Sequence, residues 1–375
     1  MTFNPHPMKT LLFTLEYPPF YGGVANYYGN LIKHWPQPDE IFILSNNDGC
    51  LIKNWSWPKW LPAVWQLKKE IKKNKISHVL VGHILPLGTV AWLLSKFIDF
   101  KYSVILHGLD FAFAGRSFRK RWLAKKILNQ AENIVCANSY TAKLVADFLG
   151  SKGKIVVVNP GIASRPSPIA HRPSQIKEKY NLENKFVLLT VGRLVKRKGI
   201  DLVLACLPEV LRQVPDLVYA IIGDGPEEEN IKKLVAGLKL KKNVLMIDNA
   251  DNEERNAWYN VCGIFIMPAR QIGNDFEGFG IVYLEANLAN KPVIAGDSGG
   301  VRDAVVDGLN GLLVNPENKE EITEAIIKLV RDENLRKKLG EKGRERTIKE
   351  FSWEKQIGKI YNLIKGADFE IKVHT

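Results

Sequence analysis

Short apolar segments alternate with longer amphipathic segments along nearly the whole chain of 375 residues. The short segments have the length and composition of buried strands, and the longer ones repeat their apolar residues with the period of a helix. Buried strands that alternate with amphipathic helices form a parallel sheet covered on both faces. The pattern therefore predicts an α/β fold built from doubly wound parallel sheets.

The alternation occurs as two series. The first predicts strands at Lys9–Leu15, Glu40–Leu44, His78–Val81, Tyr102–Leu106, Asn133–Ala137 and Ile155–Val158, and helices at Val24–Lys33, Leu61–Lys73, Gly88–Phe97, Ser117–Asn129 and Ser139–Phe148, with Ser139 as an N-cap. The second predicts strands at Lys185–Val191, Val218–Ile222, Val244–Ile247, Ile264–Met267, Val293–Ala295 and Gly311–Val314, and helices at Ile200–Gln213, Glu227–Ala236, Lys319–Arg331 and Asn334–Glu350.

A proline-rich segment, Asn159–Ser174, separates the two series and has no apolar periodicity, which is typical of a linker. We expect one domain at residues 1–165 and a second at 166–353. An amphipathic helix in residues 354–375 is expected to return to the first domain. Ligands of such sheets bind beyond the carboxyl ends of the strands, so two facing domains would form a deep cleft.

The positive charge is concentrated in the first domain. Residues 1–170 carry a net charge of +12 out of the total of +13, and they hold seven of the nine tryptophans. This asymmetry indicates that the first domain meets an anionic surface.

Several features indicate a cytoplasmic protein. The N-terminus lacks the apolar region of a signal peptide, and no segment reaches the roughly 20 apolar residues that span a bilayer. The four cysteines are scattered, which favours free thiols in a reducing compartment. No group of His, Cys, Asp or Glu has metal-ligand spacing, so we expect no metal and no cofactor.

The segment Glu277–Glu285 carries two carboxylates around the predicted start of a helix near Gly280. Glu277 would lie in the loop before the helix, and Glu285 would lie one to two turns inside it. Free amides at that N-terminus, around Ile281 and Val282, favour an anion. The segment therefore suits a nucleotide sugar, although a Glu at a helix start can also serve only the helix dipole.

A basic loop, Gly192–Gly199, follows the strand at Lys185–Val191. Arg193 offers a planar fork and Lys198 a point charge, and together they can grip a diphosphate. A solvated basic loop is the alternative. The loop Gly296–Gly300 leaves room for a sugar or is simply flexible.

Two weaker features lie in the first domain. Gly22 and Gly23 open its first helix, where helix-end amides can approach a phosphate. His107 follows the strand at Tyr102–Leu106 and is expected to face the cleft, whereas His78 and His83 are interpreted as structural.

The motifs described above occur in the order Gly22-Gly23, His107, Arg193 with Lys198, and Glu277 with Glu285. In this order they resemble the motifs of the large family of retaining glycosyltransferases of the GT-B fold that contains sucrose synthases and bacterial mannosyltransferases. The segment around Glu277 is most similar to phosphatidylinositol mannosyltransferases. The resemblance implies a GT-B fold, with an acceptor-binding first domain and a donor-binding second domain that face each other across a cleft.

The resemblance also implies the role of each residue. Arg193 and Lys198 would bind and stabilise the departing diphosphate, and His107 and Glu277 would lie at the transferred sugar. Donor contacts would come from Gly22, Gly23, Arg193, Lys198, Glu277, Gly278, Phe279, Gly280, Ile281, Val282 and Glu285, the last of these on the ribose. The reaction would be a metal-independent, retaining hexosyl transfer, with GDP-mannose as the first choice of donor and a glycan or lipid-linked acceptor.

Two segments favour contact with an anionic membrane, namely the Trp-rich and Lys-rich segment Trp55–Lys73 and a basic cluster at Arg116–Lys126. For a cytoplasmic protein this contact would be with the inner face of the cell membrane. The alternative is that these helices bury their tryptophans and expose a solvated lysine face.

Two other functions compete with the glycosyltransferase interpretation. A nucleotide-sugar epimerase can share the two-domain fold, but it needs acid and base carboxylates beyond Glu277. A basic nucleic-acid-binding protein would explain the pI of about 9.4, yet no nucleic-acid-binding motif is present, so we expect no nucleic-acid partner.

Overall fold

A computed structural model describes residues 8–20, 22–54, 56–108, 110–111, 117–163, 172–248 and 250–366. The chain divides into two compact units, one made of Met1–Gly161 with Trp353–Thr375 and the other of Ile162–Ser352. The predicted boundary after residue 165 lies outside the described residues, and the division by contacts falls slightly earlier, at Gly161 and Ile162.

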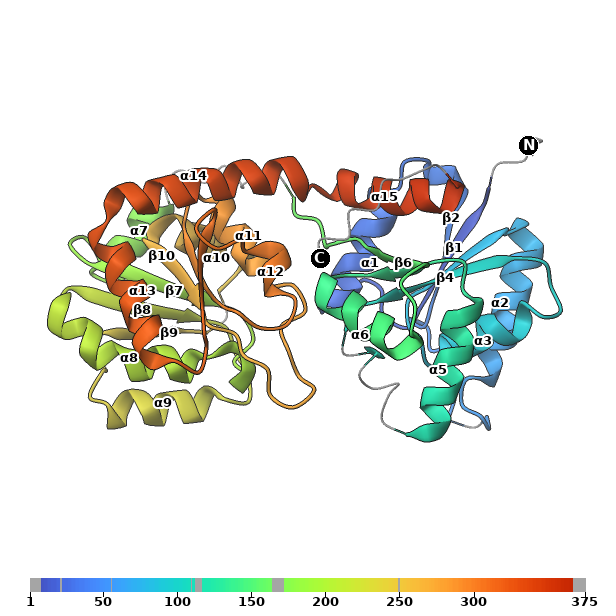
Figure 1. Ribbon diagram of the computed structural model, residues 1–375, viewed down its shortest axis with the longest axis horizontal. Helices are drawn as coiled ribbons and strands as arrows, with labels where there is room; N and C mark the ends of the chain where they lie inside the picture. The colour runs from blue at the N-terminus through green and yellow to red at the C-terminus, as the bar shows by residue number, and fades with distance from the viewer. Residues whose placement is uncertain are drawn as a thin grey trace. The chain divides into compact units, whose positions relative to one another are not determined.

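The first unit is built on a six-stranded parallel sheet in the order β2-β1-β3-β4-β5-β6 (Figure 1). Its strands are β1 (Thr10–Thr14), β2 (Ile41–Ser45), β3 (His78–Val81), β4 (Lys101–Leu106), β5 (Ile134–Cys136) and β6 (Ile155–Val157). Its helices are α1 (Gly23–Lys33), the 3₁₀ turn η1 (Pro38–Glu40), α2 (Leu61–Asn74), α3 (Leu87–Leu94), α5 (Phe118–Gln130), α6 (Ser139–Leu149) and α15 (Trp353–Lys365).

Successive residues of β1 belong to different cores because side chains alternate between the two faces of a strand. Leu11 and Phe13 join the core shared with α2, α3, α5 and α6. Leu12 joins the core on the other face, together with Tyr28 from α1 and Ile357 from α15. Both faces are therefore covered, and α15 completes a unit whose other elements lie more than 190 residues earlier in the chain.

The second unit repeats the architecture with the strand order β12-β11-β10-β7-β8-β9. Its strands are β7 (Phe186–Val191), β8 (Leu217–Ile222), β9 (Val244–Ile247), β10 (Ile264–Met267), β11 (Val293–Gly296) and β12 (Gly311–Val314). Its helices are α7 (Arg172–Lys179), the 3₁₀ turn η2 (Lys196–Lys198), α8 (Ile200–Gln213), α9 (Glu228–Gly237), α10 (Asn252–Val261), α11 (Ile281–Leu288), α12 (Val301–Ala304), α13 (Lys319–Arg331) and α14 (Glu333–Glu350).

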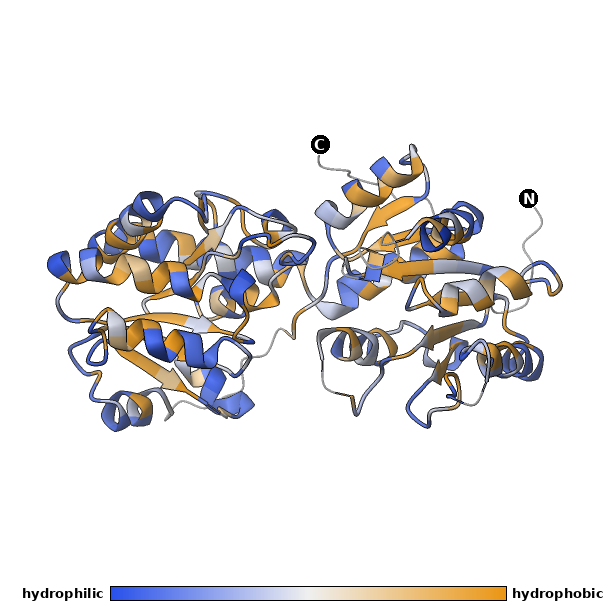
Figure 2. Ribbon diagram, turned by 90° about the horizontal axis from the view of Figure 1, so that it is seen from below, coloured by the Kyte–Doolittle hydropathy of each residue, from blue (hydrophilic) through white to orange (hydrophobic). Residues whose placement is uncertain are grey.

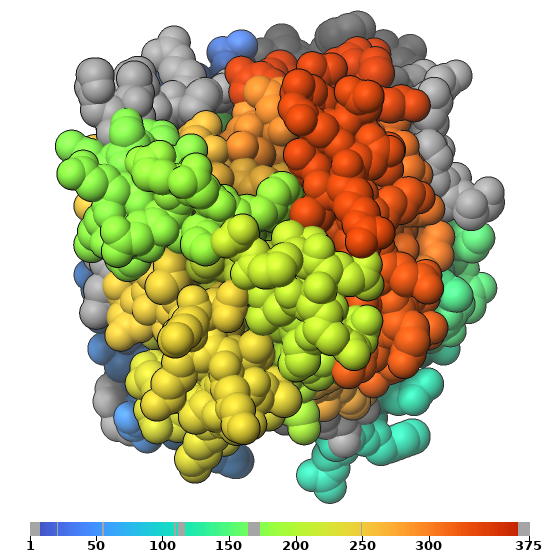
Figure 3. Space-filling model, turned by 90° about the vertical axis from the view of Figure 1, so that its left-hand side faces the viewer, coloured from blue at the N-terminus to red at the C-terminus, as the bar shows by residue number. Residues whose placement is uncertain are grey.

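The second sheet also has two cores, and adjacent residues of β7 again point to opposite sides. Leu188 packs with α8, α9 and α13, whereas Leu189 packs with α10 and α11. Figure 2 shows the strands of both sheets as hydrophobic, and Figure 3 shows the red surface of α13 and α14 beside the yellow-green surface of α8. The two parallel six-stranded sheets confirm the predicted doubly wound fold.

Several details of the prediction were wrong. The N-cap of α6 is Asn138, whose side chain accepts a hydrogen bond from the Thr141 amide, and not Ser139, which is already the first helical residue. Helix α7 begins at Arg172, inside the segment predicted as a linker, of which residues 164–171 lie outside the description. Helix α10 was not predicted at all.

Each sheet has one topological switch point, where successive connections leave in opposite directions. In the first unit the chain passes from β1 to β2 on one side, and β3 then lies on the other side of β1. In the second unit β8 and β10 flank β7 in the same manner. The loops that follow β1 and β3, and those that follow β7 and β10, therefore leave in opposite directions, and ligands of such sheets bind at positions of this kind.

Candidate active site

The loop after β7 lies tightly against the end of β10 in the second unit. Gly199 has a φ of 72° and ends the η2 turn, and a Cβ atom at this position would be 2.2 Å from the Pro268 carbonyl oxygen. The backbone amide of Arg270 also donates to the Arg197 carbonyl at 2.8 Å. These contacts fix the backbone of the basic loop at the switch point, although the side chains of Arg193 and Lys196 stay exposed to solvent.

Glu277 and Lys198 form the centre of the candidate site. The Lys198 Nζ atom donates to Glu277 Oε2 at 2.6 Å, and the two residues are only 8% and 7% exposed. Arg197 donates to the same oxygen through Nη1. Burial by itself would raise the pKa of Glu277, but Lys198 and Arg197 outweigh burial and the pKa is lowered. Glu277 is therefore an ionised, buried acceptor at neutral pH.

Arg197 joins the two acidic residues of the loop after β10. Its Nε atom is 3.1 Å from Asp275 Oδ1, while its Nη1 atom contacts Glu277. A neighbouring pair, Arg270 Nη2 with Asp201 Oδ2 at 2.6 Å, links the same loop to the start of α8. The sequence analysis missed Arg197 because three successive basic residues carry no information about which side chain turns inward.

Arg193 differs from Lys198, although both were predicted as diphosphate ligands. The Arg193 side chain is exposed, and within the described part of the chain no ion pair holds it. It lies one residue after Gly192, whose φ of 148° turns the chain away from β7. The structure thus presents one cation that is already paired with Glu277 and a second that is open to an incoming anion.

Glycines hold the loop Glu277–Gly280 against the loop after β11. Gly300 donates its amide to the Glu277 carbonyl at 2.9 Å, and a Cβ atom on Gly299 would be 2.6 Å from that oxygen. Gly280 has a φ of 78° and is the N-cap of α11, and a Cβ atom there would be 2.4 Å from the Tyr283 ring. The predicted sugar-sized space beside Gly296–Gly300 is therefore occupied in part by the backbone of Glu277 itself.

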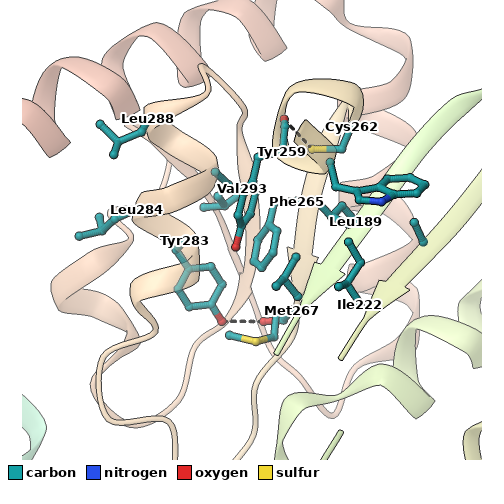
Figure 4. Packing of buried hydrophobic residues seen from close by; sticks show 14 of the residues in the cluster. Leu189, Ile222, Tyr259, Cys262, Phe265, Met267, Tyr283, Leu284, Leu288 and Val293 are labelled. Atoms are coloured by element: carbon teal, nitrogen blue, oxygen red, sulfur yellow. Dashed lines mark hydrogen bonds between the residues drawn. The ribbon is translucent and has the colours of Figure 1, made fainter. Parts of the chain in front are cut away.

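Helix α11 begins at Ile281, as the sequence predicted to within one residue. Its first turn contains no acidic side chain, so the amides of Ile281 and Val282 keep their affinity for an anion. Behind the turn, the Tyr283 hydroxyl donates to the Met267 carbonyl at 2.7 Å, which ties α11 to the end of β10 (Figure 4).

Glu285 is held by a residue that the sequence analysis missed. The Tyr259 hydroxyl, from α10, donates to Glu285 Oε2 at 2.6 Å. Burial, followed by the charge of Glu285, raises the pKa of Tyr259, so the hydroxyl keeps its proton and remains a donor. Glu285 makes no contact with Lys198 or Glu277 among the interactions of the described residues. It forms a second acidic position one to two turns into α11.

His107 lies in the first unit at the end of β4, with its ring against core tyrosines. Its Nε2 atom is 3.0 Å from the Tyr28 hydroxyl, and the rings of Tyr27 and Tyr28 pack edge-on at 4.9 and 5.4 Å. Burial lowers the pKa of His107 to about 3. The expectation that this side chain faces a cleft stays a prediction, and the structure adds that its Nε2 edge is fixed to Tyr28.

The Tyr28 hydroxyl donates its own proton to the Gly82 carbonyl at 2.7 Å, so it accepts from His107 Nε2–H. The Nδ1 atom of the neutral ring is then a hydrogen-bond acceptor. Gly22 and Gly23, at the start of α1, are both exposed, and Gly22 has a φ of 156° that suits glycine.

The tryptophans of the first unit fit the membrane interpretation in part and the core interpretation in part. Trp60 and Trp92 pack against the core, as the core alternative predicted. Trp57, Trp65 and Trp122 are 90%, 60% and 53% exposed. Trp55 and Arg116 lie outside the described residues.

A groove of about 610 Å³ lies between α3 and α5 on the same unit, lined in part by Trp92 and Trp122. Lys96 lies over the Trp92 ring at 4.7 Å and Lys126 over the Trp122 ring at 5.8 Å. Phe118, also on α5, is 85% exposed. This groove and the exposed aromatic side chains form a basic, apolar surface. In the described residues, no helix combines the length and apolar character needed to cross a membrane.

Two family models match consecutive parts of the chain. The model described as Glycosyltransferase Family 4 matches residues 21–165, and the model described as Glycosyl transferases group 1 matches residues 172–346. Each model corresponds to one of the two units, and the second contains the Lys198–Glu277 pair.

Known proteins are similar over nearly the full length. A GDP-mannose-dependent α-(1-6)-phosphatidylinositol monomannoside mannosyltransferase of Mycolicibacterium smegmatis is 28% identical, over 95% of this chain and 98% of that protein. The structure of Anabaena HepE in complex with UDP matches with a TM-score of 0.82 at 18% identity, covering 96% of this chain and all of that one. The sucrose-phosphate synthase of Thermosynechococcus elongatus matches with a TM-score of 0.76 at 21% identity, over 96% and 98% of the two chains.

Proposed function

We propose that this chain, which belongs to the GT-B glycosyltransferases of the group 1 family, transfers mannose from GDP-mannose to a phosphatidylinositol mannoside. The predictions of the fold, of the family and of hexosyl transfer are confirmed by the two family models and by the relatives. None of the relatives described above favours the epimerase alternative, whereas the absence of a nucleic-acid partner stays a prediction.

The observation that carries the proposal is the buried contact between Lys198 and Glu277 at the switch point. A cation at this place suits the phosphates of a nucleotide sugar, and an ionised carboxylate beside it suits the sugar hydroxyls. We propose that the open Arg193 makes the first contact with the diphosphate, and that Lys198 then shares its charge between Glu277 and the phosphate. Arg197 remains on Glu277 and keeps that carboxylate in place.

The remainder of the donor would follow α11. The amides of Ile281 and Val282 suit a phosphate oxygen, and Gly278, Phe279 and Gly280 bring the backbone close to the sugar. Glu285, oriented by Tyr259, suits the ribose diol. The choice of guanine as base and of mannose as sugar rests on the name of the mycobacterial relative.

The proposed reaction retains the anomeric configuration. The bond between the anomeric carbon and the diphosphate oxygen breaks, and the acceptor oxygen forms its bond on the same face. The acceptor hydroxyl proton passes to the departing phosphate oxygen. Arg193 and Lys198 stabilise the charge that develops there, and two preorganised cations in a closed site lower a barrier by several kcal/mol without a metal. We propose that His107 lies at the transferred sugar, where its Nδ1 atom accepts a hydrogen bond from a hydroxyl.

The basic, apolar surface of the first unit supports attachment to an anionic membrane. Tryptophan suits the membrane interface, and lysine is attracted to anionic headgroups. We propose that Trp57, Trp65 and Trp122 insert at this interface. The lipid-linked acceptor would then reach the first unit without leaving the bilayer.

A thermal-shift panel of GDP-mannose, UDP-glucose and ADP-glucose tests the donor. A ligand present at one hundred times its Kd stabilises the protein by about 2.7 kcal/mol. Turnover of GDP-mannose is then measured with and without phosphatidylinositol monomannoside as the acceptor. A shift with none of the three nucleotides contradicts the donor site, and a shift with UDP-glucose alone contradicts the choice of GDP-mannose.

Sedimentation with vesicles tests the membrane surface. At low salt the protein should sediment with vesicles that contain anionic phosphatidylinositol, and Trp57→Ser with Trp65→Ser should reduce the bound fraction. Leu238→Ser, at a 36% exposed position of the second unit, is the matched control. Absence of binding by the unaltered protein would contradict the membrane proposal and leave the donor site unaffected.

A further inference from the structure

Two polar side chains that the proposed donor chemistry does not use lie at the switch point of the first unit. Glu16 follows β1 and His83 follows β3, the two strands between which the connections diverge. In the second unit the same topological position holds the Lys198–Glu277 pair. A ligand crevice is therefore expected beside Glu16 as well.

His83 is fixed by the backbone. The Leu15 amide donates to His83 Nδ1 at 3.3 Å, so the proton of the neutral ring is on Nε2. The Nε2 atom lies 3.8 Å from Glu16 Oε1. The Thr14 hydroxyl and the Glu16 backbone bond to one another twice, at 3.0 and 3.2 Å, which holds the turn after β1.

Glu16 is oriented but still accessible. Its side chain is 44% exposed, whereas His83 is 14% exposed. Its second oxygen, Oε2, lies beside Gly22, where an added Cβ atom would be 3.9 Å away, and an added Cβ atom on Gly23 would meet nothing within 4 Å. The pKa of Glu16 is lowered, chiefly by the side chain of His83, so the carboxylate is ionised at neutral pH.

We infer that Glu16, oriented by His83, binds hydroxyl groups of the acceptor, a polyol such as an inositol or a hexose. An ionised carboxylate offers acceptor positions on both oxygens, and a pair of neighbouring hydroxyl groups donates to it in a bidentate manner. This inference rests on the proposed function, since it supplies the second substrate. It differs in its residues, because Lys198, Glu277 and Glu285 of the proposed donor site lie in the second unit.

Calorimetric titration in the presence of GDP tests the inference with three probes, a short-chain phosphatidylinositol monomannoside, myo-inositol and methyl α-mannoside. Glu16→Gln removes the charge at nearly constant shape. His83→Asn keeps an acceptor for the Leu15 amide and removes the Nε2 contact. Glu132→Gln is the matched control, because Glu132 is 45% exposed in the same unit, pairs with Lys101, and lies before β5 at the other end of the sheet.

We expect Glu16→Gln to weaken polyol binding on the order of tenfold or more, and His83→Asn to weaken it less. Glu132→Gln should bind like the unaltered protein, and all variants should keep their GDP affinity, which shows that they are folded. Equal polyol affinity in Glu16→Gln and the unaltered protein overturns the inference. Failure of the unaltered protein to bind any of the three polyols also overturns it, whereas retained GDP binding preserves the donor half of the proposed function.

Discussion

The Lys198–Glu277 contact allows a quantitative test by a double-mutant cycle. Lys198→Met replaces the lysine by an apolar side chain of similar length, and Glu277→Gln removes the carboxylate charge. At a separation of 2.6 Å and an exposure of 8% and 7%, the pair is shielded from solvent, so no large discount for screening applies. A hydrogen bond between charged groups in such a place contributes about 2 kcal/mol.

Each single variant leaves the other charge buried with fewer partners. We expect each to lower the free energy of unfolding by about 2–3 kcal/mol. Arg197 remains on Glu277 in the Lys198 variant, which keeps the loss at the lower end. The double variant should lose about 2 kcal/mol less than the sum of the two, because the shared contact is lost only once.

Calorimetric unfolding at pH 7.5 measures the cycle. For a unit of this size, 1 kcal/mol corresponds to a shift in Tm of about 2–4 °C. Turnover should fall on the order of a hundredfold or more in the double variant, even though its loss of stability is smaller than the sum of the two single losses, because both substrate ligands are gone. Additive effects on stability, to within about 0.5 kcal/mol, would refute the coupling that we infer from the structure.

Acid weakens the same contact in a defined direction. The folded state lowers the pKa of Glu277 from 4.5, so its contribution to stability is complete above the unfolded pKa and is lost as the pH falls through the folded pKa. The stability difference between the unaltered protein and Glu277→Gln should therefore be constant above about pH 5.5 and shrink below pH 4.5. A difference that grows on acidification would contradict the ionised state of Glu277.

Three further outcomes can be measured independently. Gly280→Ala should destabilise the second unit by about 1–3 kcal/mol and weaken nucleotide binding, because φ is 78° and the added methyl group meets the Tyr283 ring. Chemical denaturation and GDP titration measure the two effects, and an unchanged free energy of unfolding with an unchanged GDP affinity would show that the α11 N-terminus tolerates the methyl group. Tyr259→Phe should raise the KM for the donor severalfold at nearly constant kcat, since it removes only the 2.6 Å hydrogen bond to Glu285, and steady-state kinetics with an unaltered KM would exclude a role in donor binding. The ring resonances of His107 should show no titration between pH 5 and 8 by NMR, because burial lowers its pKa to about 3, and a midpoint near 6.5 would contradict the packed position.

The strands were predictable because burial on both faces requires consecutive apolar residues. The bounds of β3, β9, β10 and β12 match the predicted ranges, and those of the other strands differ by one or two residues. Helix α10 escaped prediction because its first turn is charged and its buried residues, among them Trp258 and Tyr259, occupy only its second half. Helix α7 is short and polar and adjoins a proline-rich segment, so its pattern resembles a linker.

The candidate site was predictable in its residue types but not in its pairings. Lys196, Arg197 and Lys198 are equivalent in sequence, yet Lys196 is exposed while the other two contact Glu277. The η2 turn, which ends at Gly199 with a φ of 72°, decides which of the three side chains faces inward. A tight turn rotates successive side chains by about 120°, and composition alone does not reveal the starting angle.

The sequence alone therefore determined the doubly wound fold, the two units and the segments that carry charge to the ends of the strands, because these depend on the order of apolar and polar residues along the chain. Only the tertiary structure decided that Lys198 and Arg197 share Glu277, that Tyr259 holds Glu285, and that Glu16 lies beside His83. Those partners are between 26 and 80 residues apart. Parallel strands bring such distant loops to one edge of a sheet, and the side-chain directions there depend on the backbone angles of individual turns.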